Sequence, residues 1–288
     1  MSSVDEFHYR LPRRFGGWRP GAHHGLSQGS GQAFAAHRRL FDYPDPRRLD
    51  LRASVRDAGG DWLVRVHRLR VAIRVQVVAD VSASMHFGAR RRKLDVVADL
   101  VQSLGHSAFR AGDAVGLLAF DRREREDLFM PARHARGIGN LMARMLRDCR
   151  ADTAKGGGDA VSGLRSVTER LAGRDGLVFL VSDFHWPLAA LGGLLDRLAP
   201  ACVVPVVVWD PAEVQPPRAR GWASLSDAET GARRSLWMRE SLRARWRETV
   251  ADRRVELAAV FASHDMQPFY LQGRFDAEAL TRYFLEMA

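Results

Sequence analysis

Long apolar runs alternate with amphipathic segments through the middle of this chain, and this alternation limits the folds it can adopt. The apolar runs are VAIRVQVVAD (71–80), AVGLLAF (114–120), GLVFLVSDF (176–184) and CVVPVVVWD (202–210). They are continuous rather than alternating, which is typical of strands buried on both faces. Between the first two runs, one helical face carries Leu94, Val97, Val101, Leu104 and Ala108. We therefore expect an α/β fold with a doubly wound, mostly parallel sheet and helices on both faces.

The regions on either side of this core differ from it in composition. Residues 1–70 are rich in Gly, Arg, His and Pro, so we expect a β-rich or loop extension that packs on the core. Residues 71–212 form the predicted core. Residues 213–288 should complete the same domain with a hairpin, an Arg-rich helix, a short strand and a terminal helix. His23 and His24 fit an exposed loop pair, because no third metal ligand lies at a useful spacing.

Composition argues against several classes of function. The net charge is +10, but all except two of the 44 basic residues are arginines, and many lie beside acids. This pattern indicates an arginine-biased composition rather than a nucleic-acid surface. Cys149 and Cys202 have no CxxC spacing, so neither a disulfide framework nor a zinc site is expected. No apolar stretch is long enough for a signal peptide or a membrane span, so we expect a cytoplasmic protein with no membrane partner.

Polar side chains follow the apolar runs at the points where the strands would end. They are Asp80, Ser82 and Ser84 after the first run, the loop KGGGD (155–159) before a helix, and Ser182 with Asp183 after the third run. The carboxyl ends of parallel strands meet at one edge of a sheet, where doubly wound proteins bind ligands. Carboxylate, hydroxyl and water oxygens suit a hard cation such as Mg²⁺. The sequence therefore predicts a divalent-cation site at this edge.

The segment DVSASM (80–85), followed by an amphipathic helix and by LVSDF (180–184), resembles the von Willebrand factor A domain and its metal-ion-dependent adhesion site. More closely, the chain is similar to the MoxR-associated A-domain family (domain of unknown function 58, MxaS-like). The similarity covers roughly residues 29–213. It includes FDYPDPRRLDLRASVRD (41–57), AGDAVGLLAFD (111–121) and VVVWDPAE (206–213).

This resemblance implies roles for individual residues at the strand ends. Ser82 and Ser84 would bind the cation directly, and Asp80 and Asp183 would act mostly through water. One coordination position would stay open for an acidic residue of a partner protein. The middle loop departs from the family pattern, because Gly158 stands where relatives commonly have a threonine. The further candidate contacts to the metal or the partner are Asp159, Thr153, Gly158 and His185.

The resemblance also implies a function that is not enzymatic. It suggests an interaction module, an adaptor or chaperone partner of a MoxR-type AAA+ ATPase in the maturation or metal insertion of another protein complex. Two alternatives stay open: a metal-dependent phosphoester hydrolase that uses the same oxygens, and a basic nucleic-acid-binding protein. A haloacid dehalogenase-type phosphatase needs a second carboxylate two residues after the first, and Ser82 occupies that position. KGGGD lacks the ending of a Walker A loop, so we do not expect an ATPase.

Overall fold

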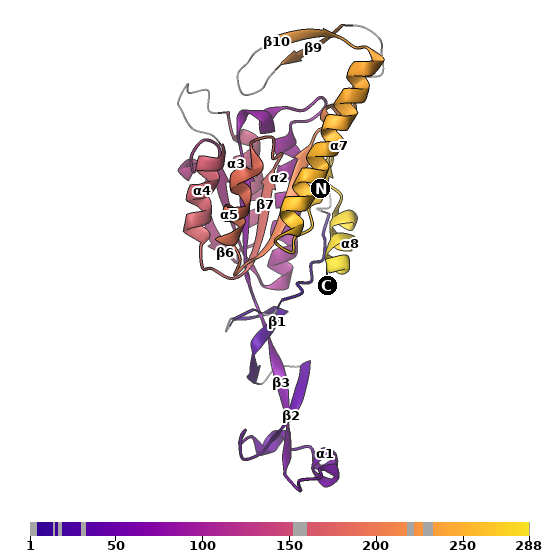
Figure 1. The fold of residues 1–288 in the computed structure, drawn as a ribbon. Helices are drawn as coiled ribbons and strands as arrows, with labels where there is room; N and C mark the ends of the chain where they lie inside the picture. Colours follow the sequence, from indigo (N-terminus) through magenta and orange to yellow (C-terminus); the bar gives the residue numbers. More distant parts are fainter. Residues whose placement is uncertain are drawn as a thin grey trace.

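A six-stranded sheet lies at the centre of the computed structural model, which describes residues 5–13, 15–16, 19–29, 33–151, 160–217, 222–226 and 233–287 (Figure 1). The strand order is β11-β8-β7-β4-β5-β6. The strands are β4 (Arg74–Asp80), β5 (Ala114–Phe120), β6 (Met130–Arg133), β7 (Leu177–Ser182), β8 (Cys202–Trp209) and β11 (Phe269–Gln272). All neighbours are parallel except β5 and β6. The predicted doubly wound, mostly parallel sheet is confirmed.

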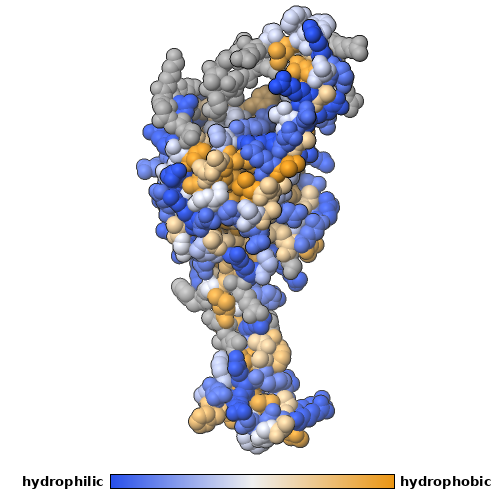
Figure 2. All heavy atoms as spheres, in the orientation of Figure 1, coloured by the Kyte–Doolittle hydropathy of each residue, from blue (hydrophilic) through white to orange (hydrophobic). Residues whose placement is uncertain are grey.

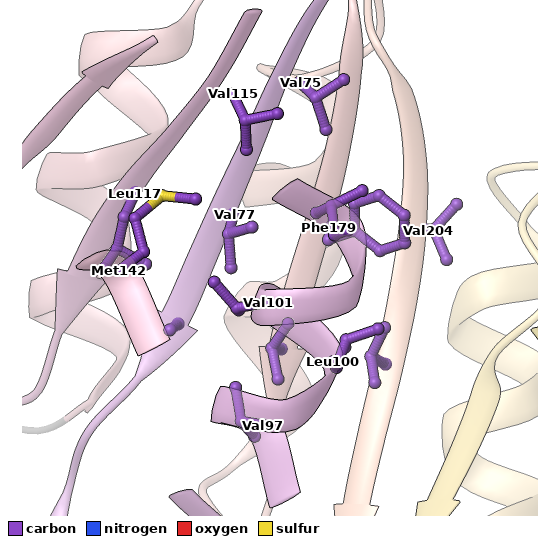
Figure 3. Close-up of a cluster of buried hydrophobic side chains, with 14 of the residues drawn as sticks. Val75, Val77, Val97, Leu100, Val101, Val115, Leu117, Met142, Phe179 and Val204 are labelled. Carbon is purple, nitrogen blue, oxygen red and sulfur yellow. The ribbon is translucent and has the colours of Figure 1, made fainter. Parts of the chain in front are cut away.

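Helices cover both faces of this sheet. One face packs against α2 (Lys93–Ala111), α3 (Ile138–Asp148) and α8 (Ala277–Met287). The other packs against α4 (Ala160–Leu171), α5 (Leu191–Asp196) and α7 (Glu240–Ala262). Val75 and Val77 of β4 lie in the first cluster, shown in Figure 3, and Val78 lies in the second. This two-sided burial explains why the strand sequences are continuous apolar runs.

Two glycines set how closely α2 and α3 approach each other. A Cβ atom at Gly105 of α2 would lie 2.3 Å from the Cα of Gly139 of α3. No ordinary van der Waals contact is that short, so the helices can keep this separation only if both positions lack side chains. Met142 and Leu146 of α3 are thereby fully buried against the core.

A second sheet projects from the body of the molecule. Its order is β1-β3-β2, with β1 (Pro20–Gly29), β2 (Ala33–Arg39) and β3 (Leu63–Val71) antiparallel to their neighbours. Figure 1 shows residues 20–71 extending away from the helices as a stalk, with α1 (Leu51–Arg56) and the 3₁₀ turn Pro46–Arg48 at its far end. Of the N-terminal residues before the stalk, Phe7, Tyr9 and Phe15 are buried in the core of the body.

A buried polar cluster joins the N-terminal residues and the stalk to the body. The Tyr9 hydroxyl donates to Asp113 Oδ2 at 2.5 Å, and His23 Nε2 lies 2.7 Å from the same oxygen. Asp113 Oδ1 accepts the backbone N–H of Ile73 at 2.9 Å. The expectation of an exposed loop pair is therefore wrong for His23, because Asp113 provides the buried hydrogen-bond partner that the local sequence does not reveal.

The short α6 (Pro211–Val214) follows β8. The predicted hairpin, formed by β9 (Trp222–Ser226) and β10 (Arg233–Trp237), lies at the end of the molecule opposite the stalk (Figure 1). Figure 1 shows this hairpin beside the first turns of α7. Within the described parts of the chain, no helix has both the length and the apolar character needed to span a bilayer.

Candidate functional site

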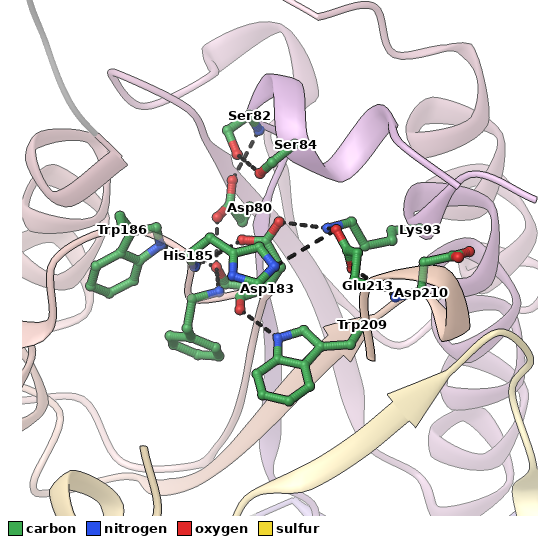
Figure 4. A network of polar contacts seen from close by, with 12 residues as sticks. Asp80, Ser82, Ser84, Lys93, Asp183, His185, Trp186, Trp209, Asp210 and Glu213 are labelled. Carbon is green, nitrogen blue, oxygen red and sulfur yellow. Dashed lines mark hydrogen bonds and ion pairs between the residues drawn. The ribbon is translucent and has the colours of Figure 1, made fainter. Parts of the chain in front are cut away.

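The predicted site residues lie at the point where the strand order reverses. From β4 the chain moves to β5 and β6 on one side, and from β7 it moves to β8 and β11 on the other. Doubly wound sheets bind ligands beyond the carboxyl ends of the strands at such a reversal. Asp80 ends β4, and Asp183 directly follows the last residue of β7, so the two carboxylates lie close together at this end of the sheet (Figure 4).

Asp80 is completely buried and accepts hydrogen bonds from the ends of both strands. Its Oδ1 accepts the backbone N–H of Ser82 at 2.9 Å, and its Oδ2 accepts the Ser182 hydroxyl at 2.6 Å. Burial and the nearby charge of Asp183 raise the pKa of Asp80 to about 6. The positive charge near this carboxylate is therefore too small to offset its burial and the charge of Asp183.

The two serines form the outer part of the site. Their hydroxyl oxygens lie 3.2 Å apart, and both side chains are half-buried. The Ser84 hydroxyl also hydrogen-bonds the Asp183 carboxylate. The structure thus brings together all four predicted metal ligands, Asp80, Ser82, Ser84 and Asp183, from two loops about one hundred residues apart in sequence.

Lys93 and Glu213 belong to this cluster, and sequence reasoning missed both. Lys93 Nζ lies 2.7 Å from Asp183 Oδ2 and 2.7 Å from Glu213 Oε1, and its side chain is only 2% exposed. Burial acts to raise the pKa of Asp183, but the Lys93 ammonium, His185 and the Ser84 hydroxyl together hold that pKa below its usual value. The sequence contained one indication of a special role for Lys93, which is one of only two lysines in an arginine-rich chain. Its compact ammonium donates to both carboxylates at once.

The loop after β8 fixes the position of Glu213. Asp210 caps α6 by accepting the N–H of Ala212 at 2.8 Å, and Glu213 Oε2 accepts the N–H of Asp210 at 2.8 Å. Asp210 Oδ2 also accepts the N–H of Ala89 at 3.2 Å, which ties α6 to the segment before α2. Glu213 is therefore held in place by this reciprocal cap.

The predicted contact residue His185 lies at the edge of the cluster. Its Nε2 is 3.7 Å from Glu213 Oε1, and its ring stacks on Trp209 at a centroid distance of 6.1 Å. Trp209 Nε1 donates to the carbonyl of Asp183 at 2.9 Å. His185 is thus a partly exposed neighbour of Glu213. Thr153, Gly158 and Asp159 lie outside the described residues.

The turn after β7 holds an uncommon backbone conformation. Phe184 has a φ of 52° although it is not a glycine, and its side chain is completely buried. Its N–H donates to Ser182 Oγ at 2.9 Å, and Arg253 of α7 donates to its carbonyl at 2.6 Å. Left-handed backbone at a bulky residue costs on the order of 1–3 kcal/mol, so the surrounding contacts must hold it.

The chemistry of the donor set fits a hard divalent cation. Two hydroxyls lie beside a carboxylate of raised pKa, and the cluster contains three carboxylates against one ammonium. Ser82 and Ser84 would hold such an ion, with Asp80 and Asp183 balancing its charge. Among the residues that the structure describes, no group of three or more His, Cys, Asp or Glu side chains could hold a metal, so this set depends on its serines.

The fold and the polar cluster define a doubly wound α/β protein with a charged patch at its switch point. The chain belongs to the family described as protein of unknown function DUF58, whose model matches residues 43–256. The family resemblance seen in the sequence is confirmed. A relative from Paracoccus denitrificans, an uncharacterized protein in the moxR 3′ region, is 35% identical over 92 residues, which are 32% of this chain and 88% of the relative.

Two solved structures are similar to this chain. The conserved hypothetical protein BatB from Bacteroides thetaiotaomicron has a TM-score of 0.44 and 13% identity over 75% of this chain and 98% of that chain. The SpRpn10 VWA domain has a TM-score of 0.37 and 9% identity over 74% of this chain and 95% of that chain.

Proposed function

We propose that the chain is a non-enzymatic interaction module, an adaptor or chaperone partner of a MoxR-type AAA+ ATPase in the maturation or metal insertion of another protein complex. The family match and the relative in the moxR 3′ region support the association with MoxR. The observation that carries the proposal is the strand-end patch, which we define as Asp80, Ser82, Ser84 and Asp183.

The residues of the patch favour binding of a cation over activation of a nucleophile. The carboxylates of Asp80 and Asp183 are buried, and the hydroxyls of Ser82 and Ser84 are half-buried above them. These hydroxyls bond to each other, and the Ser84 hydroxyl also bonds to Asp183, whose lowered pKa makes it a weak general base for a serine. A bound divalent cation would supply a positive charge to which an acidic side chain of a partner protein could bind. Lys93 keeps Asp183 ionised and fixed in this arrangement.

The cation part of the proposal is tested by calorimetric titration of Mg²⁺ and Mn²⁺ into the purified chain. We expect binding by the unmodified chain that Asp80→Ala abolishes. Binding only after Gly158→Thr would show that the site lacks one ligand, and the patch would then recognise its partner without metal. If neither the unmodified chain nor the Gly158→Thr variant binds Mg²⁺ or Mn²⁺, the cation part of the proposal is wrong.

The adaptor part is tested by affinity capture. The tagged chain is incubated with extract of its own organism, and the retained proteins are identified by mass spectrometry. We expect the unmodified chain to retain a MoxR-type ATPase together with a client complex, and the Asp80→Ala, Ser82→Ala variant to lose the partner bound through the patch. An unchanged set of partners would refute the role of the patch. Phosphoester hydrolysis that Asp183→Asn abolishes would replace the proposal with the hydrolase alternative.

A further inference from the structure

Exposed apolar side chains gather at the far end of the stalk. Phe41 is 95% exposed, Val55 84%, Leu51 59% and Trp62 57%. We call these four residues the tip patch. Figure 2 shows apolar residues at this end of the molecule, well away from the body. Apolar groups of this size are costly to leave in water together, and such patches are typical of interaction sites.

Hydrogen bonds hold the segments that carry the tip patch close to one another. The N–H of Leu40 donates to the carbonyl of Trp62 at 2.7 Å, which places the turn after β2 beside the start of β3. The N–H of Leu63 donates to Ser54 Oγ at 2.8 Å, which places α1 beside the same strand. Leu51 and Val55 are four residues apart on α1 and share one helical face.

Hydrogen bonds hold the backbone beneath the tip patch in place. The exposed apolar side chains therefore do not belong to an unsupported loop. Asp50 caps α1 by accepting the N–H of Ala53 at 3.1 Å. Its carboxylate also accepts Arg65 Nε of β3 at 2.7 Å and contacts His37 Nε2 of β2 at 3.0 Å. One buried carboxylate thereby joins the helix to two strands, and the apolar side chains project from a fixed surface.

Charge beside the tip patch indicates the chemistry of its occupant. Arg52 and Arg56 are also four residues apart on α1 and directly follow Leu51 and Val55 in sequence. Both arginine side chains are exposed. Within the described parts of the chain, neither arginine forms an ion pair. A surface that combines apolar side chains with free guanidinium groups matches a protein surface in which carboxylates border an apolar recess.

A lipid bilayer matches this end of the stalk less well. α1 has only six residues, whereas helices that lie in membrane interfaces commonly run to 20–30 residues. Asp42, Asp57 and Asp61 lie at the same end of the stalk and would repel anionic headgroups. The mixture of charges therefore favours a protein partner.

The tip patch and the strand-end patch are two separate surfaces. Figure 1 places α1 at one end of the molecule, whereas the carboxyl ends of β4 and β7 lie within the body. An adaptor must hold its ATPase and its client at the same time, and separate surfaces allow this. Resting on the function proposed above, we propose that the tip patch docks the MoxR-type ATPase and that the strand-end patch is left for the client.

The test measures binding of the purified MoxR-type ATPase of the same organism to the full chain by biolayer interferometry. The test variants are Phe41→Ser with Val55→Ser, and Arg52→Glu with Arg56→Glu. Their side chains are exposed, so the variants should fold normally, which circular dichroism checks. The matched control is Val255→Ser, which changes an apolar side chain 69% exposed on α7.

We expect each pair of tip substitutions to weaken ATPase binding by at least about tenfold, whereas Val255→Ser leaves it unchanged. Binding that survives both tip variants overturns the docking site and leaves the adaptor function standing. If the unmodified chain does not bind the ATPase, both the docking site and the adaptor function are overturned. Binding of the chain to phosphatidylserine vesicles, lost in the tip variants while ATPase binding is kept, would identify the tip as a membrane surface and also overturn the proposal.

Discussion

Lys93 shows how one buried side chain decides the charge of the strand-end patch. Its ammonium lies between Asp183 and Glu213, so it neutralises part of the negative charge that the carboxylates bring to the cluster. Burying an ion pair brings little net stability, but removing one partner leaves an uncompensated charge in the interior. The residue therefore acts on both the stability of the fold and the electrostatics of the site.

This arrangement leads to a prediction for Lys93→Met. The substitution leaves Asp183 and Glu213 without their counter-ion, so the free energy of unfolding should fall by about 3–5 kcal/mol. Urea denaturation of the variant and of the unmodified chain measures the difference. Arg245→Met is the matched control, because Arg245 is exposed on α7 and its loss should change stability by less than about 0.5 kcal/mol. Equal losses in both variants would contradict the role of Lys93.

A second residue-scale prediction concerns Asp50 at the end of the stalk. Hydrogen bonds from Arg65, Ala53 and His37 hold its pKa well below the usual value. A lowered pKa in the folded state stabilises the fold above about pH 4, and this contribution is lost as the pH falls further. Amide exchange in α1 and β3 should therefore be slower in the unmodified chain than in Asp50→Asn at pH 6. The difference should shrink below pH 4, and a constant difference would count against this account.

The sequence predicted the positions of the candidate site residues better than it predicted the residues around them. Asp80, Ser82 and Ser84 directly follow a strand and share one loop, so local pattern was enough to place them. Lys93 and Glu213 meet Asp183 only because α2 and α6 return to the same end of the sheet. Contacts of this kind depend on the path of the chain in three dimensions, which periodicity does not give.

At the scale of elements, the crossing of α2 and α3 gives the clearest test. Alanine is a better helix former than glycine by about 1 kcal/mol, so propensity alone predicts that Gly105→Ala stabilises the protein. A Cβ at Gly105, however, would lie 2.3 Å from Gly139 Cα, and forcing packed helices apart costs about 1–3 kcal/mol. We therefore expect net destabilisation.

Chemical denaturation of Gly105→Ala checks this expectation, with Gly193→Ala in α5 as the control. A Cβ at Gly193 meets no atom within 4 Å, so that change should be neutral or stabilising. A higher denaturation midpoint for Gly105→Ala than for the unmodified chain would show that the helices separate at little cost.

The elements of the core were predictable, and in the stalk the segment that forms β3 was, but β1 was not. Strands β4, β5, β7 and β8 are buried on both faces and read as continuous apolar runs. β1 and β2 are the edges of a narrow sheet, and GAHHGLSQG carries little apolar periodicity. They form strands because β3 lies between them and pairs with both, which is a non-local cause. The sequence of β1 therefore looked like a loop.

At the scale of the whole molecule, the stalk predicts an elongated particle. A compact chain of 288 residues has a radius of gyration of about 19 Å. Because residues 20–71 extend from the body in Figure 1, small-angle X-ray scattering of the monomer should give a larger value. A radius close to 19 Å would mean that the stalk folds back on the body in solution.

The path of β3 into β4 has a mechanical consequence. Only Ala72 and Ile73 separate the two strands, so one extended length of backbone, up to about 60 Å long at roughly 3.3 Å per residue, leads from Trp62 at the tip to Asp80. A pull exerted at the tip would travel along covalent bonds and reach the carboxylate directly. Asp113, bonded to the Ile73 N–H midway along this path, would be the first anchor to bear the load.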